Sequence, residues 1–283
     1  MVLVGWHRRK QYPVRAPLLG SELRPFIEAG YATDAGPRST NQDRGAVSTD
    51  WAAISDGAGG HAGGEIAAEL AIEHVVSRLG QSGRDIDEAL VLEALAGANS
   101  AVRARRRTDH RLADAAATLT IAACTSSQPA TSRWFVANLG DSPVWHSSGE
   151  NLDRLSEEHN VAAELVRAGV LSPEGARDHP GRHMITRALG MAEGVAPHVS
   201  HAVLRPGELL VLASDGVEVL TEAEILDLIA KPFDAPATAH CLVDSALFAR
   251  ATDNVTVAVL RHRVPAPTER GPGPTPWEGQ VRQ

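Results

Sequence analysis

The sequence predicts a single large layered domain built from both strands and helices. The chain has 283 residues, which is long for one average domain but within the range of one large α/β or layered domain. Its hydrophobic content is 43% with few aromatic residues, so we expect a sizeable core of Ala, Val, Leu and Ile. Short apolar runs of strand length and longer stretches of helical period both occur along the chain.

The predicted helices follow apolar residues spaced three or four positions apart. The clearest ridge, with a spacing of four, consists of Ala67, Ala71, Val75 and Leu79. Helices are expected at about 64–79, 85–107, 221–230 and 236–250. The second helix ends in the basic run Arg103–Arg107, which indicates either a solvated last turn favoured by the helix dipole or a partner-binding patch.

The predicted strands are apolar runs bounded by turn residues. They are expected at 31–34, 51–54, 118–123, 134–139, 144–146, 152–155, 195–204, 209–213 and 255–260. The polar residues 147–150 predict a hairpin turn between two of these runs. Residues 156–194 contain two short helical pieces among glycines and prolines, and such a long interrupted segment is usually functional. We call this segment the flap.

Three parts of the chain are predicted from these patterns. Residues 1–25 have no clear period and form an N-terminal lead-in, residues 26–263 form the domain, and residues 264–283 form a disordered tail rich in proline. The flap carries His159, His179 and His183, but they lack the spacing of helical zinc ligands, so a metal role is disfavoured.

Composition argues against several classes of protein. The net charge of −8 disfavours nucleic-acid binding and is compatible with clustered carboxylates for hard cations. No apolar window is long enough to cross a membrane, and the N-terminal charges follow the apolar run, the reverse of a signal peptide. Cys124 and Cys241 lie in apolar settings without a C-x-x-C motif, so buried small residues are favoured over metal ligands. A disulfide between them stays open, but nothing in the sequence calls for an oxidising compartment. The expected location is the cytoplasm.

The most informative stretch is the glycine-rich segment from Asp56 to Glu65, which follows the apolar run 51–54. Glycines there allow a backbone carbonyl and a charged ligand to approach without a Cβ in the way. The stretch alone is compatible with an ordinary turn, a nucleotide phosphate loop or a metal site. The phosphate loop needs Gly-Lys followed by Ser or Thr, whereas His61 and Ala62 follow here.

Two further aspartates share this context and favour the metal site. Asp56 and Asp215 each end an apolar run before a glycine, and Asp253 precedes the last predicted strand. Carboxylates that converge at the edge of a sheet repel one another unless a cation neutralises them. Ligands made only of oxygen select Mg²⁺ or Mn²⁺ over zinc.

In this order of motifs the sequence resembles the type 2C metal-dependent Ser/Thr protein phosphatases in their bacterial form. The resemblance spans about residues 27–262, and its motifs are Arg38–Asp43, Asp56–Glu65, Ala117–Leu119, Gly140–Ser142, Ser214–Gly216 and Asp253–Thr256. It implies an α+β fold, a four-layer αββα sandwich of two mainly antiparallel sheets flanked by helices. It also implies hydrolysis of phosphoserine and phosphothreonine by a water that bridges two Mn²⁺ or Mg²⁺ ions.

The resemblance assigns the core of the site by position. Asp56 is expected to bridge both ions, and Gly57 to offer its carbonyl. Asp215 and Asp253 complete the shell of one ion, and Asp43 holds metal-bound waters.

The remaining roles are assigned in the same way. Arg38 is expected to bind the phosphate through its guanidinium fork, and His61 to protonate the leaving alkoxide. Asp141 belongs to a third, weaker ion site, because Val219 stands where part of the family has an aspartate.

The implied partners are phosphorylated proteins, which are substrates of Ser/Thr kinases, or a cognate kinase. A non-catalytic binding module of the same fold and a metal-dependent nucleotidyl- or phosphate-transfer enzyme of another fold are the alternatives. The first would need the loss of a core ligand and the second a nucleotide loop, and the sequence has neither feature.

Overall fold

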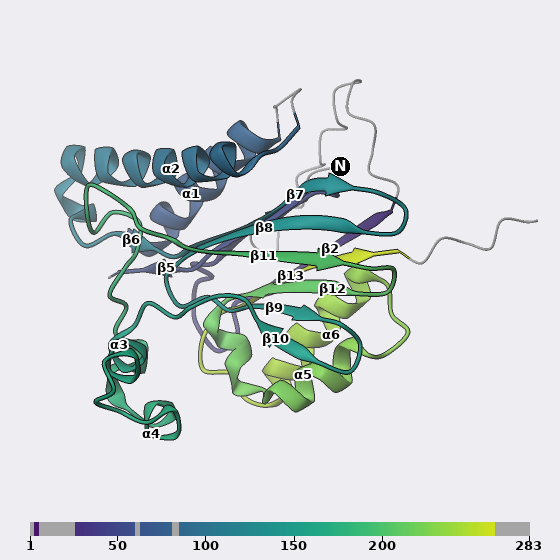
Figure 1. Ribbon diagram of the computed structural model, residues 1–283. Helices are drawn as coiled ribbons and strands as arrows, with labels where there is room; N and C mark the ends of the chain where they lie inside the picture. The colour runs from purple at the N-terminus through teal and green to yellow at the C-terminus, as the bar shows by residue number, and fades with distance from the viewer. Residues whose placement is uncertain (1–2, 6–25, 60–62, 81–84, 264–283) are drawn as a thin grey trace, which may run out of the picture.

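Two antiparallel sheets pack face to face in the computed structural model, and helices cover both outer faces (Figure 1). The structure describes residues 3–5, 26–59, 63–80 and 85–263. The layers therefore follow the order helix, sheet, sheet, helix, which confirms the predicted αββα sandwich.

The first sheet and its helices form one outer half of the sandwich. Among the described residues, its strand order is β1 (Leu3–Gly5), β3 (Arg44–Val47), β4 (Trp51–Ser55), β7 (Leu119–Ser127), β8 (Ser132–Leu139) and β11 (His198–Leu204). The helices on its outer face are α1 (Gly63–Leu79) and α2 (Glu88–Thr108). Trp51, Ile121 and Phe135 are buried against them.

The second sheet and its helices form the other half. Its described strands are β10 (Leu152–Arg154), β9 (Val144–Ser147), β12 (Leu209–Ala213), β13 (Val255–His262) and β2 (Ile27–Asp34), in this order. Its outer face is covered by α5 (Glu222–Ile229) and α6 (Ala235–Phe248). The α5 helix begins with a capping box between Thr221 and Glu224.

A third apolar cluster fills the space between the sheets. In β4, Trp51 and Ala53 face the helices, whereas Ala52 and Ile54 face the second sheet. Successive side chains of a strand alternate between its faces, so a strand buried on both faces reads as an uninterrupted apolar run. This burial explains why 51–54 could be recognised without polar alternation.

The predicted helices and most predicted strands are confirmed within a few residues, including the β9–β10 hairpin. The sequence pattern does not predict β1, β3 or the small sheet of β5 (Gly57–Ala58) and β6 (Ala116–Ala117). These strands have only two to four residues, too few to show a period.

The flap leaves the sandwich as a separate lobe (Figure 1). It contains α3 (Val161–Arg167), α4 (Pro173–Arg177) and a short 3₁₀ helix (Pro180–His183), as the breaker residues predict. Asn160 caps α3, and Ser172 caps α4 ahead of its proline.

The predicted domain boundaries are only partly covered by the structure. Within the lead-in 1–25, Leu3–Gly5 pairs with β3 as an edge strand of the first sheet. The tail 264–283 lies outside the described residues, so its disorder stays a prediction. None of the helices in the described ranges combines the length and apolar character needed to cross a bilayer.

Candidate metal centre

Five aspartates lie at the ends of strands from both sheets, and we call them the carboxylate centre. Asp43 precedes β3, Asp56 follows β4 and Asp141 follows β8, all in the first sheet. Asp215 follows β12 and Asp253 precedes β13 in the second sheet. Burial raises the pKa of Asp56 most, and the charges of the other four aspartates all raise it further, so residues far apart in sequence meet at one edge of the sandwich.

Asp43 is buried and joins the two sheets. Its Oδ2 accepts hydrogen bonds from Ser214 Oγ and Thr256 Oγ1, each at 2.7 Å. Ser214 follows β12 and Thr256 lies in β13, so both hydroxyls come from the sheet opposite to β3. Burial raises the pKa of Asp43 to about 6, although the two hydroxyl donors act in the opposite direction. The second sheet therefore fixes the direction of this carboxylate.

The backbone of Asp56 is fixed by Thr118. The Asp56 N–H donates to Thr118 Oγ1 at 2.9 Å, and the Thr118 N–H donates to the Asp56 carbonyl at 2.9 Å. Thr118 Oγ1 also lies 2.9 Å from Ser142 Oγ, next to Asp141. Two motifs whose threonine and serine had no predicted role thus supply the frame for the aspartates.

Glycines let the loop after Asp56 fold back onto the start of α1. A Cβ added to Gly57 would lie 2.3 Å from the carbonyl oxygen of Gly64, and one added to Gly64 would lie 2.6 Å from the Gly57 carbonyl. The two backbones are therefore in direct contact, at a distance no other residue type allows. This contact holds Gly57, whose carbonyl is a predicted ligand, beside the first turn of the helix.

The chemistry of the centre fits a divalent cation. Burial raises the pKa of Asp56 well above its ordinary value, and the charges of Asp43 and Asp215 raise it further. Burial and the charge of Asp253 raise the pKa of Asp215, although a hydrogen bond with Asp56 acts in the opposite direction. Buried carboxylates of this kind are neutralised either by protons or by a metal ion. Donors made only of oxygen suit Mg²⁺ and Mn²⁺.

These pKa shifts predict that Mn²⁺ binding releases protons at mildly acidic pH. Burial raises the pKa of Asp43 to about 6 and that of Asp141 to about 7. The folded, metal-free protein then holds protons that the unfolded chain has lost, so its free energy of unfolding should fall as the pH rises from about 4 to 7. Because a bound carboxylate is deprotonated, Mn²⁺ should displace more protons at pH 6 than at pH 8. Calorimetry in buffers of different ionisation enthalpy measures this release, and equal release at both pH values would contradict the assignment.

Arg38 lies against Asp253 in the structure. Its Nη2 is 2.8 Å from Asp253 Oδ2, and its Nε donates to the Thr252 carbonyl at 3.1 Å. The two side chains are 57% and 43% exposed, so this ion pair contributes at most about 1 kcal/mol to stability. In the described part of the chain, no three His, Cys, Asp or Glu side chains are grouped tightly enough to hold a metal ion by themselves. Asp253 is thus paired with Arg38, and its charge also acts on Asp215.

Asp141 is surrounded by two further carboxylates. Burial and the charge of Asp215 raise its pKa to about 7, and Glu218 and Glu158 add to the shift. Arg154 pairs with both glutamates, at 2.8 Å to Glu158 and 3.0 Å to Glu218. This group of Glu158, Glu218 and Arg154 beside Asp141 could not be deduced from the spacing of the motifs.

The predicted histidines have different positions. His61 lies outside the described residues, so its role stays a prediction. His183 lies near enough to Asp215 for its charge to lower the pKa of that carboxyl. His159 is buried at the root of the flap, and His179 caps the short 3₁₀ helix.

Arg44 is a buried residue that the sequence analysis missed. Its Nη1 donates to the carbonyls of Asn41 at 2.7 Å and Asp43 at 2.8 Å, and its Nη2 contacts Glu65 Oε1 at 2.6 Å. Glu65 lies in the first turn of α1, at the end of the glycine-rich stretch. Arg44 therefore ties Asp43 to the loop that carries Asp56, although the sequence around it resembles a solvated turn.

Asn254 positions the loop that contains Arg38 and Asp43. Its Nδ2 donates to the carbonyls of Ala35 at 2.9 Å and Thr40 at 3.0 Å. Its Oδ1 accepts from the Gln42 N–H at 2.8 Å. The motif Asp253–Thr256 thus contributes an aspartate, this amide and the hydroxyl that binds Asp43.

The chain is similar to known protein phosphatases. The family model for protein phosphatase 2C matches residues 37–251. Protein phosphatase PhpP of Streptococcus pneumoniae is 29% identical over 247 residues, which cover 83% of this chain and 97% of that protein. Serine/threonine protein phosphatase PstP of Mycobacterium tuberculosis is 32% identical over 226 residues, which cover 78% of this chain and 42% of that protein. The catalytic domain of PstP, solved in complex with two manganese ions, superposes with a TM-score of 0.74 at 27% identity and covers 83% of this chain and 97% of that domain.

Proposed function

Since the chain belongs to the protein phosphatase 2C family, we propose that the carboxylate centre is the site at which it hydrolyses phosphate esters. The enzyme is a metal-dependent protein serine/threonine phosphatase that uses two Mn²⁺ or Mg²⁺ ions, in agreement with the family match and with the manganese-bound PstP domain. One observation carries the choice of site. Aspartates from both sheets converge, and the charges of the others raise the pKa of Asp56.

The proposed ligands follow from the position of each residue. Asp56, the Gly57 carbonyl, Asp215 and Asp253 would hold the two ions. Asp43, held by the hydroxyls of the opposite sheet, orients the waters around the ions. When bound, such a metal pair lowers the pKa of a shared water and offsets the charge that develops on the phosphoryl group.

Arg38 has an exposed side chain and can reach a substrate. Arg38 is the proposed phosphate ligand, and its exposed pair with Asp253 is weak enough to be exchanged. If Asp253 turns to a metal ion, the Arg38 guanidinium becomes available for two phosphate oxygens. His61 remains the predicted proton donor to the leaving alkoxide.

Arg38→Ala should raise KM for an aryl phosphate by about tenfold and leave Mn²⁺ affinity almost unchanged, because the guanidinium reaches phosphate and not the ions. Arg38→Lys is the matched variant, which keeps the charge but loses the planar fork. Its KM should lie between those of wild type and Arg38→Ala. Steady-state kinetics and Mn²⁺ titration of the same samples separate the effects. A drop in Mn²⁺ affinity at constant KM would show that Arg38 serves the metal site.

Protein substrates and further ions extend this proposal. The similar phosphatases from bacteria are in keeping with phosphorylated proteins as substrates. We propose that the substrates are the products of a Ser/Thr kinase, with a cytoplasmic location, and that Asp141 holds a weaker third ion. Val219, where an aspartate would strengthen that third site, is an exposed residue that cannot bind a cation.

A non-catalytic binding module is the alternative that needs a direct test. Titration of Mn²⁺ into the metal-free protein should show at least two ions, and Asp253→Asn should weaken one of them. If wild-type protein binds no Mn²⁺ in the micromolar to millimolar range, the centre is not a metal site and the module is favoured.

A further inference from the structure

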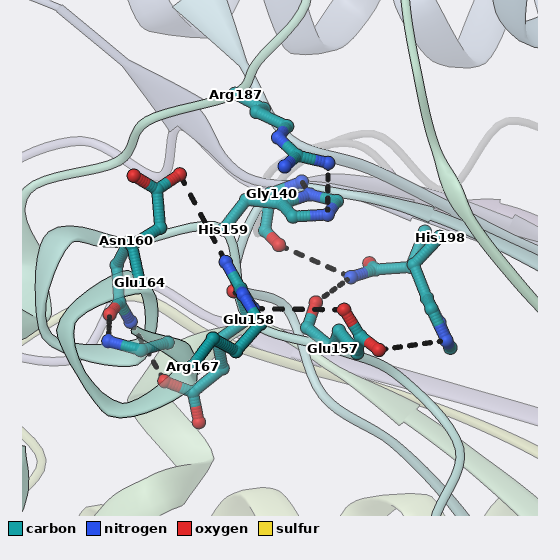
Figure 2. Close-up of polar contacts among 11 residues, drawn as sticks. Gly140, Glu157, Glu158, His159, Asn160, Glu164, Arg167, Arg187 and His198 are labelled. Carbon is teal, nitrogen blue, oxygen red and sulfur yellow. Dashed lines mark hydrogen bonds and ion pairs between the residues drawn. The ribbon is translucent and has the colours of Figure 1, made fainter. Parts of the chain in front are cut away.

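The first residues of the flap form hydrogen bonds with the turn that carries Asp141. The His159 N–H donates to the Gly140 carbonyl at 3.0 Å, and the Gly140 N–H donates to His159 Nδ1 at 3.1 Å (Figure 2). His159 is 1% exposed, so these two hydrogen bonds are closed to solvent. His159 thus binds both polar backbone groups of Gly140: its ring accepts from the N–H, and its backbone N–H donates to the carbonyl.

Gly140 has little freedom to move away from His159. Its φ is +117°, and a Cβ at this position would lie 2.5 Å from Thr118 Cγ2. Asn138 Nδ2 donates to the Gly140 carbonyl at 3.1 Å and to the Glu157 carbonyl at 2.9 Å. Residues 157–159 therefore fix the end of β8 by hydrogen bonds, and the orientation of the Asp141 backbone depends on these bonds.

The hydrogen-bond pattern defines the protonation state of His159. Because Nδ1 accepts from a backbone N–H, the ring proton lies on Nε2. Nε2 lies 3.4 Å from Arg187 Nη1 (Figure 2), and because an arginine nitrogen can only donate, this contact would need the opposite tautomer. The Gly140 hydrogen bond is shorter, at 3.1 Å, and comes from a fixed backbone N–H, so it sets the tautomer and the Arg187 contact is not a hydrogen bond. Burial lowers the pKa of His159 to about 4, and the charges of Arg187 and Arg167 act in the same direction, whereas Glu157 acts against them. A neutral ring that can accept at Nδ1 is therefore the stable form.

The same residue also holds the returning part of the flap. The His159 carbonyl accepts from the Thr186 N–H at 2.8 Å, and Asn160 pairs with Ile185 in an antiparallel bridge. His159 thus touches the turn before Asp141 on one side and the end of the flap on the other.

We propose that His159, as the neutral Nε2–H tautomer, is a positioning residue that sets the direction of the Asp141 carboxylate and couples the flap to the metal centre. This rests on the proposed function, in which Asp141 is a ligand of the weaker third ion. Loss of the Nδ1 acceptor should let the Gly140–Asp141 turn rotate. The third ion should then bind less tightly, while the ions at Asp56 and Asp215 are little affected.

Two amide substitutions separate the two ring nitrogens. Asn can place its Oδ1 where Nδ1 lies and accept from the Gly140 N–H, whereas the longer Gln places its polar atoms where Nε2 lies. His159→Gln should therefore weaken the lowest-affinity Mn²⁺ step by about tenfold or more, as loss of such an outer partner usually does. His159→Asn should stay within about threefold of wild type. His179→Gln is the matched control, because His179 Nδ1 also accepts from a backbone N–H, that of Gly181 at 3.0 Å, but this bond lies within the flap.

Calorimetric Mn²⁺ titration and ¹⁵N NMR of the wild-type ring and the Gly140 amide provide the readouts. The expected NMR result is an unprotonated Nδ1 that receives a hydrogen bond, a signature that needs neither metal nor activity. A protonated Nδ1 in the wild-type protein, or equal Mn²⁺ affinities in the Asn and Gln variants, would overturn the proposal. If wild-type protein bound Mn²⁺ but hydrolysed no phosphate ester, the proposed function would fail while the role of His159 could still stand. If the Gln variant does not fold, the wild-type NMR signature decides.

Discussion

Asp56→Asn is expected to lower kcat by about three orders of magnitude while the fold is retained. The amide has nearly the same shape, and the hydrogen bonds between Asp56 and Thr118 that involve the Asp56 backbone stay in place. The charge that would bridge the ions is lost, and a metal pair supplies several kcal/mol of transition-state stabilisation at about 1.4 kcal/mol per tenfold in rate.

The same substitution should make the metal-free protein more stable, which separates the catalytic effect from unfolding. Burial and the four neighbouring aspartates make the Asp56 charge unfavourable, so its removal relieves that cost. Aryl phosphate kinetics and thermal unfolding without metal measure the two effects, with Asp227→Asn on the exposed face of α5 as the control. Activity within tenfold of wild type would show that Asp56 is not a core ligand.

Gly57→Ala should have a large effect for a single added methyl group at the site. The added Cβ would lie 2.3 Å from the Gly64 carbonyl oxygen and 2.9 Å from that of Gln42, both backbone atoms that cannot rotate away. Such overpacking costs typically about 1–3 kcal/mol, and relief requires the loop to move from α1. Both the free energy of unfolding and Mn²⁺ affinity should therefore fall, the latter because the Gly57 carbonyl is a proposed ligand.

Gly194→Ala is the matched control for this substitution. A Cβ at Gly194 meets no atom within 4 Å, and its backbone is not in the left-handed region. Denaturant unfolding and Mn²⁺ titration should give values close to wild type for Gly194→Ala. If Gly57→Ala unfolds and binds Mn²⁺ like this control, the backbone contact between Gly57 and Gly64 does not constrain the site.

The sequence was most informative where chemistry and local pattern agree. The apolar run 51–54 and the ridge from Ala67 to Leu79 predicted β4 and α1 because burial imposes a period on each element. The glycines after Asp56 were expected to open space for a ligand. In the structure they also allow the backbones of Gly57 and Gly64 to touch. This contact could not be predicted without knowing where Gly64 lies relative to Gly57.

The contacts that orient the aspartates could not be predicted in this way. Asp43 binds Ser214 and Thr256, which are 171 and 213 positions away in sequence. Arg44 could be taken for a solvated residue because nothing local indicates its pair with Glu65 across the site. The order of the motifs predicted that the aspartates share one site, but only the tertiary structure shows which hydroxyls, amides and arginines hold them.

Release of phosphate from matched phosphothreonine and phosphotyrosine peptides, with Mn²⁺ and after exhaustive chelation, tests the central claim most directly. The metal-dependent mechanism predicts turnover of the phosphothreonine peptide with Mn²⁺, little turnover of the phosphotyrosine peptide, and recovery of activity when Mn²⁺ is added back to the chelated enzyme. Full activity after chelation would contradict the assignment of the carboxylate centre as a catalytic metal site.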